Sequence, residues 1–109
     1  MNKSTQIKNT VAKIDTAKIA AYLEEHPKSK TLRQIIGYIK GVQQTNDEQE
    51  IFKMGVRTAY NLDTICDPNK AGYVKNKEEK KHWLEISEEL FKNTVGVKNK
   101  AKETDEQTS

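Results

Sequence analysis

The chain has 109 residues, of which 34% are hydrophobic and 32% are charged, and its net charge is +3. Globular domains typically contain about 45–50% apolar residues, glycine included, and about 25% charged residues. The length and the scarcity of apolar residues exclude a second hydrophobic core, and no apolar run approaches the ~20 residues that cross a bilayer. The single cysteine, Cys66, excludes an internal disulfide and fits a reducing compartment, so we expect a cytoplasmic protein.

Both ends of the chain are polar. Residues 1–10 contain lysine but no hydrophobic region of the kind found in a signal peptide, and we expect them to be flexible. Residues 97–109 have almost no apolar side chains and are predicted to be disordered. The sequence therefore predicts one helical domain over residues 11–96.

The first predicted helix runs from Thr16 to Glu25, with Asp15 as its N-cap. It ends before Pro27, because a proline disfavours helical geometry in the residue before it. Whether Val11 and Ile14 extend this helix toward the N-terminus stays open.

The second predicted helix runs from about Leu32 to Val42 and begins with a capping box formed by Thr31 and Gln34. Its apolar residues share one face at helical spacing, which is typical of a core-facing helix. These residues are Leu32, Ile35, Ile36, Ile39 and Val42.

A third helix is predicted after Asn46, its expected N-cap, and it ends before Pro68. The residues expected to face the core are Phe52, Gly55, Val56, Ala59, Leu62 and Cys66. A fourth helix is predicted over about residues 77–94, with Trp83, Leu84, Ile86, Leu90 and Phe91 on one side. No segment alternates with the period of a strand, so we predict an all-α fold, a small bundle of about four helices with flexible polar termini.

The residues that carry catalytic or metal chemistry are sparse. Cys66, His26 and His82 are too few for a structural zinc site, and Glu79 with His82 matches a di-iron helix motif only once. Cys66 lies on an apolar stripe, where a small buried side chain is the ordinary interpretation. We therefore expect no enzymatic activity, no metal and no cofactor.

A basic surface is predicted on the second helix. The first 45 residues hold eight basic and three acidic side chains, whereas the remainder holds eleven basic and thirteen acidic ones. Along the second helix, polar residues recur three or four positions apart beside the core stripe, and a glycine among them would let a phosphate approach closely. The candidate residues for binding an anion or a nucleic acid are Lys28, Lys30, Arg33, Gly37, Lys40 and Gln44. The alternative is that Gly37 accommodates a neighbouring helix and that the cations are simply solvated.

A second candidate surface lies on the third helix, opposite its expected core stripe. Methionine and isoleucine around an arginine are typical of a protein interface. The candidate residues are Met54, Arg57, Asn61 and Ile65. The alternative is that this helix packs against neighbours on two sides.

The functional hypothesis is a small, non-enzymatic regulatory protein that binds a larger protein as an adaptor or inhibitor, a type that phages and mobile elements use. The alternative is nucleic-acid binding through the basic N-terminal half. A helix-turn-helix is disfavoured, since Asp47, Glu48 and Glu50 would begin the recognition helix and repel DNA. We expect no membrane association, while self-association into a homo-oligomer stays open.

Overall fold

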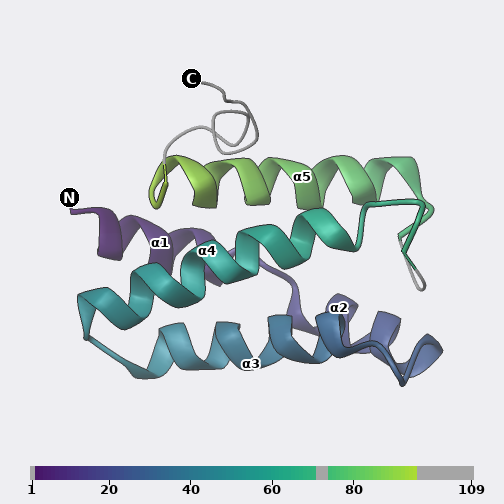
Figure 1. Cartoon of the computed structure of the whole chain (residues 1–109), viewed down its shortest axis with the longest axis horizontal. Coiled ribbons are helices and arrows are strands. Elements are labelled where there is room, and N and C mark those ends of the chain that lie inside the picture. The colour runs from purple at the N-terminus through teal and green to yellow at the C-terminus, as the bar shows by residue number, and fades with distance from the viewer. Residues whose placement is uncertain (1, 71–73, 96–109) are drawn as a thin grey trace.

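Five helices make up the computed structural model, which describes residues 2–70 and 74–95 (Figure 1). They are α1 (Lys3–Ala12), α2 (Thr16–Glu25), α3 (Lys30–Gln44), α4 (Glu48–Thr64) and α5 (Lys77–Lys92). No strand occurs within the described ranges, which confirms the all-α class with one helix more than predicted. None of these helices is both long enough and apolar enough to cross a membrane.

The helices form two layers around one core. In Figure 1, α3, α4 and α5 lie side by side with α4 in the middle, while α1 and α2 lie behind them. Helix α4 contacts α1, α3 and α5, so it forms the centre of the fold. The largest fully buried side chains come from all five helices and include Ile7, Ile19, Leu32, Ile51, Trp83 and Phe91.

Each helix begins at a side chain that accepts hydrogen bonds from free N–H groups of the first turn. These N-caps are Asn2, Asp15, Ser29, Asp47 and Asn76. Asp15 confirms the predicted start of α2. The predicted caps of the next two helices were wrong: Ser29 replaces the Thr31 capping box, and Asp47 replaces Asn46. In both cases a neighbouring oxygen makes the capping bond, and the boundary shifts by one or two residues.

The first ten residues, which we expected to be flexible, contain most of α1. Ile7 and Val11 are fully buried in the core, and Ser4 and Thr10 are buried beside them. Two of the four buried residues of α1 carry hydroxyl groups. Apolar residues therefore do not recur at helical spacing in this segment, and the sequence did not indicate a helix. Val11 belongs to α1 rather than to α2, and the predicted tail over residues 97–109 lies outside the described residues.

The buried residues of α4 and of the turn after it agree with our prediction at Gly55, Ala59, Leu62 and Cys66 but differ at other positions. Ile51 is buried and Phe52 is exposed, so the expected placement of Phe52 in the core was wrong. Thr58 is fully buried and donates a hydrogen bond to the carbonyl of Met54 at 2.7 Å. Because this bond satisfies the hydroxyl within its own helix, a residue that looks polar in the sequence lies in the core.

Candidate binding surfaces

The described residues considered for catalysis or metal binding form no cluster that could hold a metal ion. Cys66 is buried, with its Sγ 3.7 Å from the carbonyl oxygen of Lys80, whereas His82 is exposed and its ring lies against that of Trp83. No group of three or more His, Cys, Asp or Glu side chains that could hold a metal ion occurs among residues 2–70 and 74–95. The open depression on the outer side of α5 is lined mainly by charged side chains of that one helix: Lys77, Lys80, Lys81, Leu84, Glu85 and Glu88. A single charged helix face does not enclose a small-molecule site.

Glu79, considered above as a metal ligand with His82, instead joins α5 to α2. Its carboxylate accepts a hydrogen bond from the Tyr22 hydroxyl and pairs with the Lys18 ammonium at 3.6 Å. The Trp83 indole N–H donates to the Tyr22 oxygen at 3.1 Å. Burial, together with the hydrogen bond to Glu79, raises the pKa of Tyr22 to about 12. The hydroxyl therefore stays protonated and donates to the carboxylate.

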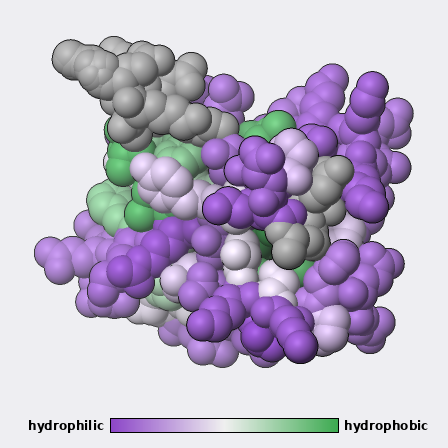
Figure 2. All heavy atoms as spheres, turned by 45° about the vertical axis from the view of Figure 1, so that its right-hand side comes forward, coloured by the Kyte–Doolittle hydropathy of each residue, from purple (hydrophilic) through white to green (hydrophobic). Residues whose placement is uncertain are grey.

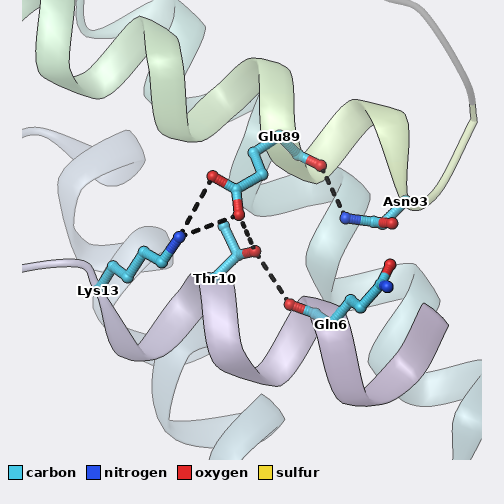
Figure 3. Close-up of polar contacts among 5 residues, drawn as sticks. All are labelled: Gln6, Thr10, Lys13, Glu89 and Asn93. Atoms are coloured by element: carbon cyan, nitrogen blue, oxygen red, sulfur yellow. Dashed lines mark hydrogen bonds and ion pairs between the residues drawn. The ribbon is translucent and has the colours of Figure 1, made fainter. Parts of the chain in front are cut away.

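A second carboxylate, Glu89, joins α5 to α1 (Figure 3). The Thr10 hydroxyl lies 2.9 Å from Glu89 Oε2 and 2.9 Å from the Gln6 carbonyl oxygen, and its single proton can be donated to only one of them. Lys13 Nζ lies 3.2 Å from the same Glu89 oxygen. Partial burial is the largest single effect on the pKa of Glu89 and raises it, but the bonds from Thr10 and Lys13 together lower this pKa below its ordinary value.

The N-terminal lysines thus have structural partners. Lys13 and Lys18 pair with the two carboxylates of α5, and Lys8 donates to the side-chain oxygen of Asn46 at 3.0 Å. These three lysines recur at five-residue intervals, a spacing that forms no stripe on a helix. Since they come from two helices and a turn, each reaches a different neighbour.

The interface predicted on α4 does not form an exposed patch. Ile65 is 3% exposed and belongs to the core, and the thioether of Met54 lies over Gly41 of α3. The Asn61 side chain donates to the Gln34 side chain of α3 at 3.3 Å. Of the four predicted residues only Arg57 is exposed. This side of α4 therefore packs against α3, as the alternative interpretation held.

A different part of α4 exposes large apolar side chains. Phe52 is 38% exposed, Tyr60 is 47% exposed, and Val95, just after α5, is 53% exposed. Val56 lies between the first two and packs against the core while remaining half-buried. We call Phe52, Val56, Tyr60 and Val95 the α4 apolar patch. On the face drawn in Figure 2, hydrophobic surface lies mainly at the upper left, and most of the remaining surface is hydrophilic.

The α4 apolar patch is held in place by contacts below it. The rings of Tyr60 and Phe91 meet edge to face, with centroids 4.8 Å apart. Thr94 lies close to Gly55, which places Val95 near the turn of α4 that holds Phe52 and Val56. The repeat of Phe52, Val56 and Tyr60 at four-residue intervals was the signal in the sequence, but we assigned Phe52 and Val56 to the core and did not consider Tyr60.

The basic residues of α3 are all exposed. Lys30, Arg33, Gly37, Lys40 and Gln44 recur three or four positions apart on the side of α3 that faces away from the core, and we call them the α3 basic stripe. A Cβ added to Gly37 would meet nothing within 4 Å, so this glycine accommodates no neighbouring helix of the described chain. Arg33 also donates to the Pro27 carbonyl oxygen at 2.8 Å, which holds the turn before α3.

Helices α3 and α4 run antiparallel along each other, since Gly41 meets Met54 at one level and Gln34 meets Asn61 about two turns away. The two helices of a helix-turn-helix instead cross steeply, at about 90–120°. The exposed Arg57 lies between Met54 and Asn61 in the sequence of α4, the two residues that make these contacts with α3. One cation of the predicted protein interface therefore belongs to the segment of α4 that runs along α3.

Comparisons of this chain with protein-family models, with curated proteins and with solved structures gave no significant match.

Proposed function

We propose that this protein is a non-enzymatic binding protein whose α4 apolar patch docks onto a larger protein, as an adaptor or inhibitor. The observation that carries this proposal is the exposure of Phe52, Tyr60 and Val95 on one part of a surface that is otherwise mostly hydrophilic. Aromatic side chains are enriched in protein interfaces and dominate their binding energies, since they bury a large area at a small cost in side-chain entropy.

The state of the patch before binding supports the proposal. The Tyr60 ring is already packed against Phe91, and Val56 is anchored in the core, so little conformational freedom is lost when a partner covers them. Exposed cations border the patch: Lys53 and Arg57 lie on the same helix. A polar rim around an apolar centre is the usual arrangement of an interface. A reducing compartment such as the cytoplasm suits the buried free thiol of Cys66.

The test compares two single substitutions to aspartate. Phe52→Asp places a charge in the patch, while Ala20→Asp places the same charge on an exposed position of α2 and serves as the control. Tagged wild type and both variants are used for affinity capture from nuclease-treated lysate of the source cells, after circular dichroism has confirmed that all three fold. We expect the same protein to be captured by the wild type and by Ala20→Asp and to be lost with Phe52→Asp.

Two results would contradict the proposal. Capture of the same partner by Phe52→Asp would show that the patch is not the docking surface. Light scattering that reports a wild-type dimer, converted to a monomer by Phe52→Asp, would show that a second copy of this chain covers the patch instead.

A further inference from the structure

The α3 basic stripe has a charge pattern unlike that of the rest of the molecule. No aspartate or glutamate occurs between Glu25 and Asp47, so every formal charge on α3 is positive. Within the part of the chain that the structure describes, ion pairs form at Lys13, Lys18 and Lys53, and none forms at a cation of α3. We propose that the α3 basic stripe binds the phosphate backbone of duplex DNA, independently of the α4 apolar patch.

The spacing of the cations suits a phosphate backbone. With a rise of about 1.5 Å per residue, the stripe from Lys30 to Lys40 is about 15 Å long, which is the axial length of roughly four phosphates of one DNA strand. The exposed Arg57, on the segment of α4 that runs along α3, is a further cation on the neighbouring helix. Amide side chains, such as that of the exposed Gln44, supply further hydrogen-bond donors to phosphate and sugar oxygens.

Gly37 points to a close approach at the centre of the stripe. A glycine in an exposed helix interior costs stability relative to alanine, and no neighbour in the described structure requires it, because an added Cβ would meet open space. Without a side chain at this position, the backbone of a ligand can approach α3 between the side chains of Arg33 and Lys40. A phosphate held there would interact with both cations.

One feature favours a duplex over a single strand, and another limits where a nucleic acid can lie. Among the described residues, the large aromatic side chains that are exposed, Phe52 and Tyr60, lie on α4 and not on the stripe, whereas binding of single strands normally uses aromatic rings on which bases stack. At the other end, the acidic first turn of α4, with Asp47, Glu48 and Glu50, would repel phosphates. The contact is therefore limited to α3 and the adjoining seam, and it reads the backbone rather than base sequence.

The test uses fluorescence anisotropy with a labelled 24-base-pair DNA duplex, the single strand of the same length, and polyglutamate as a competitor. If three or four phosphates are neutralised, affinity for the duplex falls about 40- to 150-fold between 50 and 200 mM salt. We expect the single strand to bind more weakly than the duplex. We also expect polyglutamate, at an equal concentration of charge, to leave the duplex bound.

The variants separate a local site from a general effect of charge. Lys30→Glu with Lys40→Glu is expected to weaken duplex binding at least 30-fold, while Lys75→Glu with Lys81→Glu makes the same change in net charge away from α3 and should weaken it less than about threefold. None of these four exposed lysines makes a side-chain hydrogen bond or ion pair in the described structure, and circular dichroism is to be used to check that every variant folds. The neutral pair Lys30→Gln with Lys40→Gln should lower the slope of log affinity against log salt by about 2.

Gly37→Gln tests the close approach. This substitution should raise the melting temperature, because glutamine favours the helix, and should weaken duplex binding at least fivefold, because its side chain covers the stripe. Four results would overturn the proposal: equal losses in the two Glu double variants, tighter binding of the single strand, displacement of the duplex by polyglutamate, or a Gly37→Gln protein that is more stable and binds as tightly as the wild type.

Discussion

Lysine has different surroundings on two sides of this molecule. Where α1 and α2 meet α5, Lys13 and Lys18 pair with Glu89 and Glu79, and each pair joins two helices. On the outer side of α3, Lys30 and Lys40 have no acidic residue within their own helix. The type of residue is the same on both sides. The presence of a carboxylate within reach decides whether the cation supports the fold or remains available to a ligand.

Glycine shows the same contrast. A Cβ added to Gly55 of α4 would lie 2.9 Å from a methyl carbon of Ile7, so α1 can pack against α4 only because this side chain is absent. A Cβ added to Gly37 of α3 would meet nothing. One glycine therefore permits a contact inside the fold, while the other leaves an open position on the surface.

The largest effect is expected from Gly55→Ala. Because Ile7 is fully buried and its Cγ2 methyl is next to the backbone, it cannot move away cheaply, and we expect a loss of about 1–3 kcal/mol in the free energy of unfolding. Urea denaturation followed by circular dichroism measures this loss. A variant as stable as the wild type would show that α1 does not pack closely on α4.

A smaller effect is expected from Glu89→Gln, which removes the charge that Lys13 and Thr10 bind. The Glu89 side chain is 41% exposed and water screens the pair, so we expect a loss of only about 1 kcal/mol at pH 7. The pKa of Glu89 is lower in the folded protein, so its contribution is present above the ordinary value of 4.5 and is lost as the pH falls through the folded pKa.

Thermal melts between pH 7 and pH 3 provide the measurement for this carboxylate. The stability of wild type and variant should converge as the solution is acidified. Glu85→Gln, which removes an exposed carboxylate of the same helix and makes the same change in net charge, serves as the control. A constant difference between wild type and Glu89→Gln across this range would contradict the assigned role of the charge.

The smallest effect, opposite in sign, is expected from Gly37→Ala. An alanine at this open helical position should stabilise the protein by about 0.5–1 kcal/mol, because it restricts the unfolded chain and meets no neighbour. Melting of Gly37→Ala beside Gly55→Ala compares the same substitution on the two sides directly. Destabilisation by Gly37→Ala would mean that this face of α3 is covered in solution.

The predictable elements are those whose apolar residues recur at helical spacing. The core stripe of α3 and the start of α2 at Asp15 were correctly predicted, because Ile and Leu residues or a carboxylate cap mark them plainly. Helix α1 and part of the buried face of α4 were missed. Their buried faces include Thr10 and Thr58, whose hydroxyl groups are satisfied by hydrogen bonds, so residues that look polar lie in the core.

The candidate surfaces divide in the same way. The α3 basic stripe could be predicted from the sequence, because its residues lie on one helix and their spacing determines that they share one side of it. The α4 apolar patch could not, since it depends on how α4 is rotated against α1 and α5 and on where Val95 lies after α5.

The sequence by itself determined that the protein is all-helical and that its positive charge is concentrated around α3, because helical periodicity and charge are local properties of the chain. Only the tertiary structure decided which cations are paired, which glycine is covered and which apolar side chains remain exposed. These outcomes depend on contacts between residues far apart in the chain. Thr10 and Glu89, for example, are 79 positions apart.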